Sequence, residues 1–331
     1  MRHTAEFDVR HDTSRVPPGL QALLKEIIDY AGIFPPASLH LEEAARRFAL
    51  YRSSENSWML ASFVCPAPRL KELLPLTSLF EGDSPLDLSI LLTSGASSDA
   101  SLESLDDDLE SVTRIRQEVD VTIKQLEGRI PDDLLETDVV SVRKFIDRVG
   151  AACAASELQE AAVFLEVALD ERRHQVLPVV NGALSAFNRQ QLNSPDGPMG
   201  AKFRMGGPDV PSPEAVAYAI TTCRDAGVRF KATAGLHHPF RRQEPAVEHG
   251  FINVFAAAAL AMAHGLDVDS LVAILTDSDP EHFKFSSDGF EWMTFAVSMA
   301  QIERVRREGI VSFGSCDFDE PLEDLHSLGL I

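Results

Sequence analysis

The sequence has few cysteines, and none of them are paired at the short spacing that binds zinc. The four cysteines are far apart and form no CxxC pair; they are Cys65, Cys153, Cys223 and Cys316. This pattern indicates neither a structural zinc site nor a disulfide framework. A reducing compartment is therefore expected, and the cytoplasm is the predicted location.

Long apolar runs are also missing. The longest run, Val254–Ala263, is shorter than the about 18 residues that a membrane span requires. The first 15 residues are polar and lack the apolar segment of a secretory signal. We therefore expect a protein that neither crosses a membrane nor carries such a signal.

Basic residues are scarce relative to acidic ones. The 331 residues include 30 Lys and Arg against 51 Asp and Glu, which gives a formal net charge of −21. A surface of this charge repels polyanions, so we expect neither nucleic acid nor an anionic membrane as a partner. A local basic pocket is still compatible with this composition. The hydrophobic share of 45% is sufficient for a full core.

Two kinds of pattern alternate along the chain. Residues 1–57 are predicted to be helical, because apolar residues recur at helical spacing from Leu20 to Ile28 and again from Leu41 to Tyr51. Later, short apolar runs bounded by Pro, Gly or Ser predict buried strands at 58–68, 86–95, 119–128, 161–169, 200–207, 228–235 and 310–315. Helices are predicted near 139–155, 174–187, 213–226, from 248, at 268–275 and at 290–307, with a short strand at 281–285.

This alternation predicts an α/β fold, a (β/α)8 TIM-type barrel over residues 58–331 with an N-terminal helical extension over residues 1–57. An open doubly wound sheet is the competing architecture. The barrel is preferred because no glycine fingerprint follows the first predicted strand. The extension is expected either to cap the barrel floor or to form a contact in a homo-oligomer.

Basic residues gather where a barrel would place its site. Residues at the carboxyl ends of barrel strands line the active site. Lys202 and Arg204 share one face of a predicted strand, and Lys231 lies on the next strand. The long loop that follows contains His237 and His238 and is expected to cover a substrate.

We expect this cationic cluster to attract a small carboxylate or phosphate. Two neighbouring lysines also lower the pKa of one ammonium, which would supply a neutral amine for Schiff-base chemistry. The alternative is that each lysine forms an ordinary ion pair, with Glu127 or Glu166 as the partner.

Two further residues are predicted to bind substrate. Glu166 lies in an apolar strand, so it is expected either in a polar barrel mouth or paired with Lys202 or Arg204. Cys316 follows the last strand and is placed near Cys65, because the first and last strands of a closed barrel are neighbours. An inert small residue at a strand end is the alternative role for Cys316.

Four strings, DYAGIFPPAS (29–38), AKFRMGG (201–207), FKATAGLHHP (230–239) and FGSCDFDEP (313–321), resemble a family of bacterial proteins with no assigned activity. That resemblance covers nearly the whole chain and implies no mechanism.

The two lysine-bearing strands, KFRMGG and GVRFKATAG, resemble those of deoxyribose-phosphate-aldolase-like class I aldolases. The resemblance covers about a tenth of the chain and implies that Lys202 forms the Schiff base while Lys231 tunes it. Arg204 and Met205 depart from the small hydroxyl residues of that family, and the HHP loop has no counterpart there.

The predicted function is a TIM-barrel lyase of the aldolase kind that acts on a small anionic carbonyl compound without a cofactor. The predicted catalytic residues are Lys202, Lys231, His237 and His238. The predicted substrate-binding residues are Arg204, Glu166 and Cys316. One alternative is a metal-dependent hydrolase or lyase with ligands from His237, His238, His249 and Glu166. The other is a non-catalytic anion-binding protein.

Overall fold

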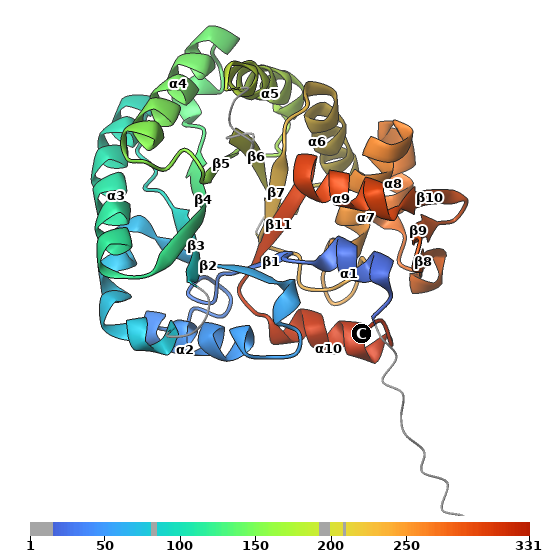
Figure 1. Cartoon of the computed structure of the whole chain (residues 1–331). Helices are drawn as coiled ribbons and strands as arrows, with labels where there is room; N and C mark the ends of the chain where they lie inside the picture. Colours follow the sequence, from blue (N-terminus) through green and yellow to red (C-terminus); the bar gives the residue numbers. More distant parts are fainter. Residues whose placement is uncertain (1–15, 81–84, 192–198, 208–209) are drawn as a thin grey trace, which may run out of the picture.

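The computed structural model describes residues 16–80, 85–191, 199–207 and 210–331. In this part of the chain, eight parallel strands close into a barrel, and helices surround it (Figure 1). The predicted (β/α)8 barrel class is therefore confirmed.

The barrel strands follow the chain order around the ring, and the last strand closes it between β7 and β1. Their bounds are β1 Ile28–Tyr30, β2 Leu60–Pro66, β3 Leu86–Leu91, β4 Val121–Arg129, β5 Ala162–Glu166, β6 Met199–Arg204, β7 Phe230–Thr233 and β11 Ile310–Ser315. Because all neighbours are parallel, the carboxyl ends of the strands meet at one rim.

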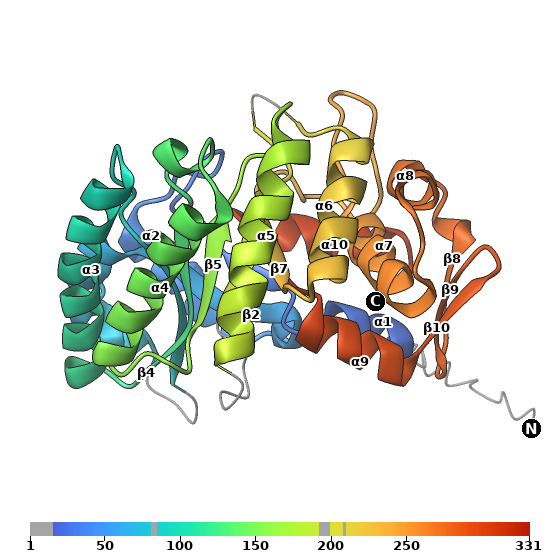
Figure 2. The same ribbon diagram turned by 90° about the horizontal axis from the view of Figure 1, so that it is seen from above.

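Helical segments connect the strands and cover the outside of the barrel, where α3 to α6 lie side by side (Figure 2). The α-helices are α1 Pro18–Leu24, α2 Leu41–Arg52, α3 Ser98–Glu118, α4 Val139–Ala155, α5 Arg173–Gln190, α6 Pro213–Ala226, α7 Phe251–His264, α8 Val268–Thr276, α9 Met299–Glu308 and α10 Asp319–Ser327. Short 3₁₀ helices span Ser57–Met59, Ala67–Glu72, Leu74–Phe80, Asp132–Leu134 and Pro280–His282. No helix in the described ranges is both long and apolar enough to cross a membrane.

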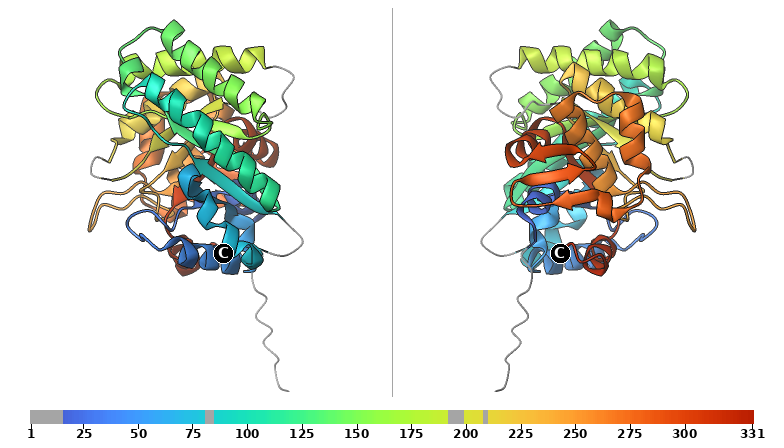
Figure 3. Two further views of the ribbon diagram at one scale, coloured as in Figure 1. Left: turned by 90° about the vertical axis from the view of Figure 1, so that its left-hand side faces the viewer. Right: turned by 90° about the vertical axis from the view of Figure 1, so that its right-hand side faces the viewer.

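A second, antiparallel sheet lies on the side of the barrel (Figure 3). It consists of β8 Phe283–Phe285, β9 Gly289–Trp292 and β10 Phe295–Ser298. The strand predicted at 281–285 is present, but it belongs to this sheet. The helix predicted at 290–307 is wrong in its first half, because residues 290–298 form a hairpin and α9 begins only at Met299.

The predicted helical extension needs a correction. The helical pattern seen from Leu20 to Ile28 ends at Leu24 in the structure, and Ile28–Tyr30 forms β1 of the barrel. Helix α2 then packs on β2 as the first helix of the barrel. The range 1–57 therefore contains a barrel strand and a barrel helix, whereas α1 packs against α9 and β9.

The core between the helices and the strands is apolar, as the burial of the whole of α7 from Phe251 to Ala261 illustrates. This helix is covered by β11, α8 and α9, so apolar residues occur on every side of it. The inside of the barrel differs, because it holds charged and polar side chains.

Candidate active site

Every strand of the barrel contributes a polar side chain to one connected group inside it. The members are Asp29 (β1), Ser62 (β2), Ser89 (β3), Gln125 and Glu127 (β4), Glu166 (β5), Lys202 (β6), Lys231 (β7) and Ser312 (β11). All except Glu166 are buried. We call these nine residues the interior network. Buried polar groups of this kind are costly unless each finds a partner.

Lys231 is at the centre of the interior network. Its Nζ atom donates to Asp29 Oδ2 at 2.7 Å, to Gln125 Oε1 at 2.7 Å and to Glu127 Oε1 at 2.6 Å. An ammonium has three N–H donors, so these contacts use all of them. Lys231 is fully buried and is held in position by partners from two strands, β1 and β4.

Asp29 anchors the deep end of the network. Its two carboxylate oxygens accept short hydrogen bonds of 2.5 Å from Ser62 and Ser312 on the flanking strands. Gln125 completes the group with an amide contact to Ser312 at 3.3 Å. Asp29 is therefore positioned by both neighbours of β1, and Lys231 is positioned by Asp29.

Lys202 lies at the other end of the network, at the carboxyl rim. Its Nζ atom contacts Glu127 Oε2 at 3.2 Å and Glu166 Oε2 at 3.0 Å. Arg204 also approaches Glu166, at 3.5 Å. Glu166 is therefore paired with both residues, which confirms the pairing expected from its apolar strand.

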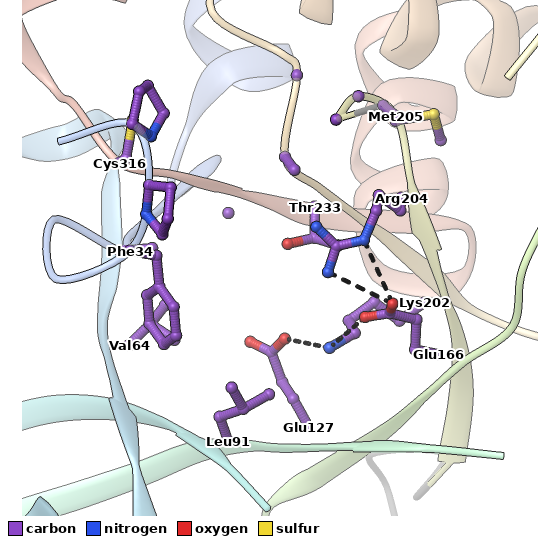
Figure 4. A pocket seen from close by; sticks show the side chains of 18 of the residues that line it. Phe34, Val64, Leu91, Glu127, Glu166, Lys202, Arg204, Met205, Thr233 and Cys316 are labelled. Atoms are coloured by element: carbon purple, nitrogen blue, oxygen red, sulfur yellow. Dashed lines mark hydrogen bonds and ion pairs between the residues drawn. The ribbon is translucent and has the colours of Figure 1, made fainter. Parts of the chain in front are cut away.

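A pocket opens above Lys202 (Figure 4). It has a volume of about 900 Å3, and Glu127, Glu166, Lys202 and Arg204 contribute to its lining. Lys231 is fully buried and is not among the lining residues. The pocket thus reaches only one of the two predicted lysines.

The predicted cationic cluster needs a correction, because carboxylates neutralise it. The cluster has three cations, Lys202, Arg204 and Lys231. They are met within the described part of the chain by three carboxylates, those of Asp29, Glu127 and Glu166. The lysine ion pairs anticipated as the alternative are therefore present, with Asp29 as an additional partner.

The charge states inside the barrel follow from this pairing. Burial alone lowers the pKa of Lys231, but Asp29 and Glu127 outweigh it, and the net pKa of Lys231 is raised. Burial alone raises the pKa of Glu127, but the ammoniums of Lys231 and Lys202 outweigh it, and the net pKa is lowered. The expected lowering of a lysine pKa by its neighbour is therefore wrong for Lys231, which stays an ammonium.

The lowered pKa of Glu127 predicts acid sensitivity. A carboxylate whose pKa is lowered in the folded state stabilises the protein at pH values above the pKa that it has in the unfolded chain, which is near 4.5 for a glutamate. This stabilisation is lost as the pH falls below that value. In urea unfolding between pH 5 and pH 3, Glu127→Gln should therefore show a shallower loss of stability than wild type, by up to about 1.4 kcal/mol per pH unit. Equal slopes in the two proteins would contradict an ionised Glu127.

The two adjacent histidines have different surroundings. His237 lines the pocket, and its Nδ1 atom lies 3.3 Å from Glu320 Oε2. His238 is outside the lining, where its Nδ1 atom lies 2.6 Å from Asp324 and its Nε2 atom lies 3.1 Å from Arg242. Both rings approach Glu320, because His238 Nε2 lies 3.9 Å from Glu320 Oε1, but only His237 lines the pocket. His237 is therefore the histidine that a pocket ligand can reach.

His249 does not join them. Its Nε2 atom lies 2.8 Å from the Pro211 carbonyl, and its Nδ1 atom lies 3.3 Å from an Arg241 guanidinium nitrogen. Burial lowers the pKa of His249, so the ring is neutral and both nitrogens are engaged. Among the described residues, no group of three or more His, Cys, Asp or Glu side chains is arranged to hold a metal ion. The predicted metal alternative thus lacks its ligand set in this part of the chain.

Cys316 lines the pocket, and burial raises the pKa of its thiol. It therefore presents a neutral, weakly polar group. Its expected closeness to Cys65 rested on the assumption that β2 is the first strand. Because β1 lies between β2 and β11, that assumption is wrong.

The loop from Gly235 onward reaches over the pocket. Ala246, Val247 and Glu248 belong to the lining.

Gly206 and Gly235 bring the ends of β6 and β7 together, since a Cβ on Gly206 would lie 2.5 Å from the Gly235 Cα. The glycines are therefore explained by the close approach of two backbones at the rim.

Sequence reasoning did not single out Asp29 as a site residue and named Glu127 only as a possible lysine partner. Asp29 was assigned to a helix, which hid its strand position. A signal was present, since a lone carboxylate between Ile28 and Tyr30 is as costly to bury as Glu166 in its apolar strand.

Comparisons with known proteins give structural likeness only. No protein-family model matches the sequence, and a search of curated proteins finds no match. Among solved structures, a deoxyribose phosphate aldolase from Aeropyrum pernix, described as tetrameric, is similar at 12% identity, with a TM-score of 0.48 and coverage of 93% of this chain and 97% of that chain. A protein from Toxoplasma gondii ME49, provisionally described as a deoxyribose-phosphate aldolase, is similar at 10% identity, with a TM-score of 0.48 and coverage of 94% and 96%.

Proposed function

We propose that this protein is a lyase of the aldolase kind that forms a Schiff base between Lys202 and a small anionic carbonyl compound. One observation carries the proposal. Of the two lysines in the interior network, Lys231 has all three donors engaged, whereas Lys202 lies at the pocket between two carboxylates.

The two lysines then have different roles. Lys231 remains an ammonium and holds Glu127 in place through the contact of 2.6 Å. Glu127 in turn holds the Nζ atom of Lys202 at 3.2 Å. The sequence resemblance to class I aldolases implies the same division between Lys202 and Lys231. Lys231 is thus a positioning residue, and Lys202 is the proposed nucleophile.

Schiff-base formation needs a neutral amine at Lys202 and a group that accepts its proton. Glu166, 3.0 Å away and partly exposed to the pocket, is that acceptor, because Glu127 is held ionised by two ammoniums. The freed electron pair on Nζ attacks the carbonyl carbon, and the oxygen takes up a proton. Loss of the resulting hydroxyl as water, after a second protonation, leaves a carbon–nitrogen double bond.

The iminium so formed is an electron sink. Cleavage of the bond between the α and β carbons, with loss of the proton of a β-hydroxyl group, sends its electron pair toward the iminium nitrogen and gives an enamine on Lys202, while the β carbon leaves as the carbonyl carbon of an aldehyde or ketone. Protonation of the enamine at its α carbon and addition of water to the resulting iminium release the second product and free Lys202. His237, with Glu320 at 3.3 Å from its Nδ1 atom, is the proposed base that takes the proton of the β-hydroxyl group during cleavage. Arg204 is the proposed partner of the substrate anion, because the Glu166 contact at 3.5 Å holds its guanidinium only loosely.

The experiment is reductive trapping. The wild-type protein is incubated near neutral pH with a panel of small aldehydes and 2-oxo acids and reduced with borohydride. The mass of the intact protein is then measured by mass spectrometry. A single adduct with the mass of the reduced carbonyl compound supports the proposal. A compound that binds tightly in calorimetry yet leaves no adduct would contradict it and favour a non-catalytic anion-binding protein.

A further inference from the structure

The wall of the pocket opposite Lys202 is apolar. Phe34 from the β1–α2 loop and Val64 from β2 lie across the cavity from Lys202 and Glu166, and Leu91 from β3 lies beside Glu127 (Figure 4). These three residues, which we call the apolar wall, offer no hydrogen-bonding side chain. A substrate that extends from the carbonyl toward this wall loses its water without gaining polar contacts there.

Apolar side chains also line the mouth of the pocket. Val210 and Val247 line the pocket, and their side chains are 37% and 45% exposed. They belong to the segments that follow β6 and β7. Exposed apolar side chains that gather around a cavity are typical of a binding site that a ligand covers.

The charges of the site reach the apolar wall only at Leu91, whose strand neighbour Glu127 also lines the pocket. Lys202, Glu166 and Arg204 occupy one side, and their mutual ion pairs leave that side nearly balanced. A volume of about 900 Å3 exceeds what a carbonyl carbon and one anionic group require. The apolar wall and the two valines line part of the remaining space, and Arg129, His237 and Glu248 also line the pocket.

We propose that the carbonyl compound carries an apolar alkyl or aryl group on the side of its carbonyl away from Arg204, and that this group lies against the apolar wall. The inference rests on the proposed function for the position of the carbonyl at Lys202. It specifies a substrate that is anionic at one end and hydrophobic at the other, and it disfavours a polyhydroxylated chain.

A homologous series tests the inference. Wild-type protein is trapped with unbranched 2-oxo acids of increasing alkyl length and with hydroxylated acids of the same length. Each methylene that reaches the apolar wall should lower the half-saturating concentration by about fourfold, and each hydroxyl should remove that gain. Equal half-saturating concentrations for alkyl and hydroxylated chains would overturn the inference.

Variants locate the effect. Leu91→Ser should flatten the dependence on alkyl length, whereas Leu50→Ser, at a leucine on α2 that is 71% exposed, should leave it unchanged. If Leu91→Ser does not fold, Val247→Ser serves the same purpose, with Val140→Ser as the matched change at a valine that is 56% exposed and does not line the pocket. An unchanged alkyl dependence in both pocket variants would contradict the assigned wall.

Calorimetric binding of the same series separates this inference from the proposed function. Affinity that rises with alkyl length while no adduct forms supports the apolar wall and overturns the role of Lys202. Adduct formation without dependence on alkyl length supports Lys202 and overturns the apolar wall.

Discussion

Lys231→Met is expected to lower the free energy of unfolding by about 3–5 kcal/mol, the loss found when one partner of a buried ion pair is removed. Lys231 is fully buried and is the shared partner of Asp29 and Glu127. Methionine has a similar volume and fills the same space, but it removes the ammonium that pairs with Asp29 and leaves Glu127 with Lys202 alone. The loss is therefore electrostatic rather than a cavity effect.

Urea unfolding at pH 7 measures this loss. Lys284→Met, the same substitution at an exposed lysine on β8, should change the stability by less than about 0.5 kcal/mol. In a double-mutant cycle, Asp29→Asn should offset the Lys231→Met loss by about 1–3 kcal/mol, because it removes one of the stranded charges. A Lys231→Met protein as stable as wild type would refute the buried ammonium.

The second large effect is expected at Lys202. Lys202→Met should abolish borohydride trapping and reduce turnover of the best-trapped compound by on the order of 10⁴-fold or more, as for the loss of other enzyme nucleophiles. The stability cost should be smaller than that of Lys231→Met. Glu127 keeps the ammonium of Lys231 as its partner, and Glu166 keeps the guanidinium of Arg204.

The contrast between the two lysines is the informative result. Lys202→Met is expected to fold but to form no adduct with the carbonyl compound. Lys231→Met is expected to show mainly a lower free energy of unfolding. Lys202→Arg serves as the matched control, because it restores the positive charge between the two carboxylates without providing a nucleophilic amine. An adduct that still forms in Lys202→Met would show that the nucleophile is a residue other than Lys202.

Much of the barrel could be predicted from the sequence. The strands β2 to β7 and β11 are short apolar runs between breakers, a pattern typical of strands covered on both faces. β1 could not be recognised, because three residues are too few to show their own period. Ile27 and Ile28 continue the apolar spacing of the helix before them, although that helix ends at Leu24.

The hairpin at 289–298 was obscured in a similar way. Phe290, Trp292 and Phe295 are compatible with a helical stripe, and a strong helix follows from Met299. The decisive information is tertiary, because this hairpin packs beside α1, α7 and α9 at a distance in sequence. Packing of this kind outweighs the intrinsic secondary-structure preference of the residues in the hairpin.

The candidate site was predictable in its lysines and less so in its acids. Lys202 and Lys231 stand at matching positions of consecutive strands, which the sequence order alone places side by side. Asp29 and Glu127 reach the same lysine only through barrel closure, because their strands β1 and β4 are not neighbours of β7. No local pattern encodes that closure.

The most direct test of the account is to map the trapped adduct. Wild-type protein is reduced with borohydride in the presence of the best-bound 2-oxo acid, digested, and sequenced by tandem mass spectrometry. The account predicts that the added mass lies on Lys202 and that Lys231 is recovered unmodified. An adduct on Lys231, or on neither lysine, would contradict the division of roles proposed for the interior network.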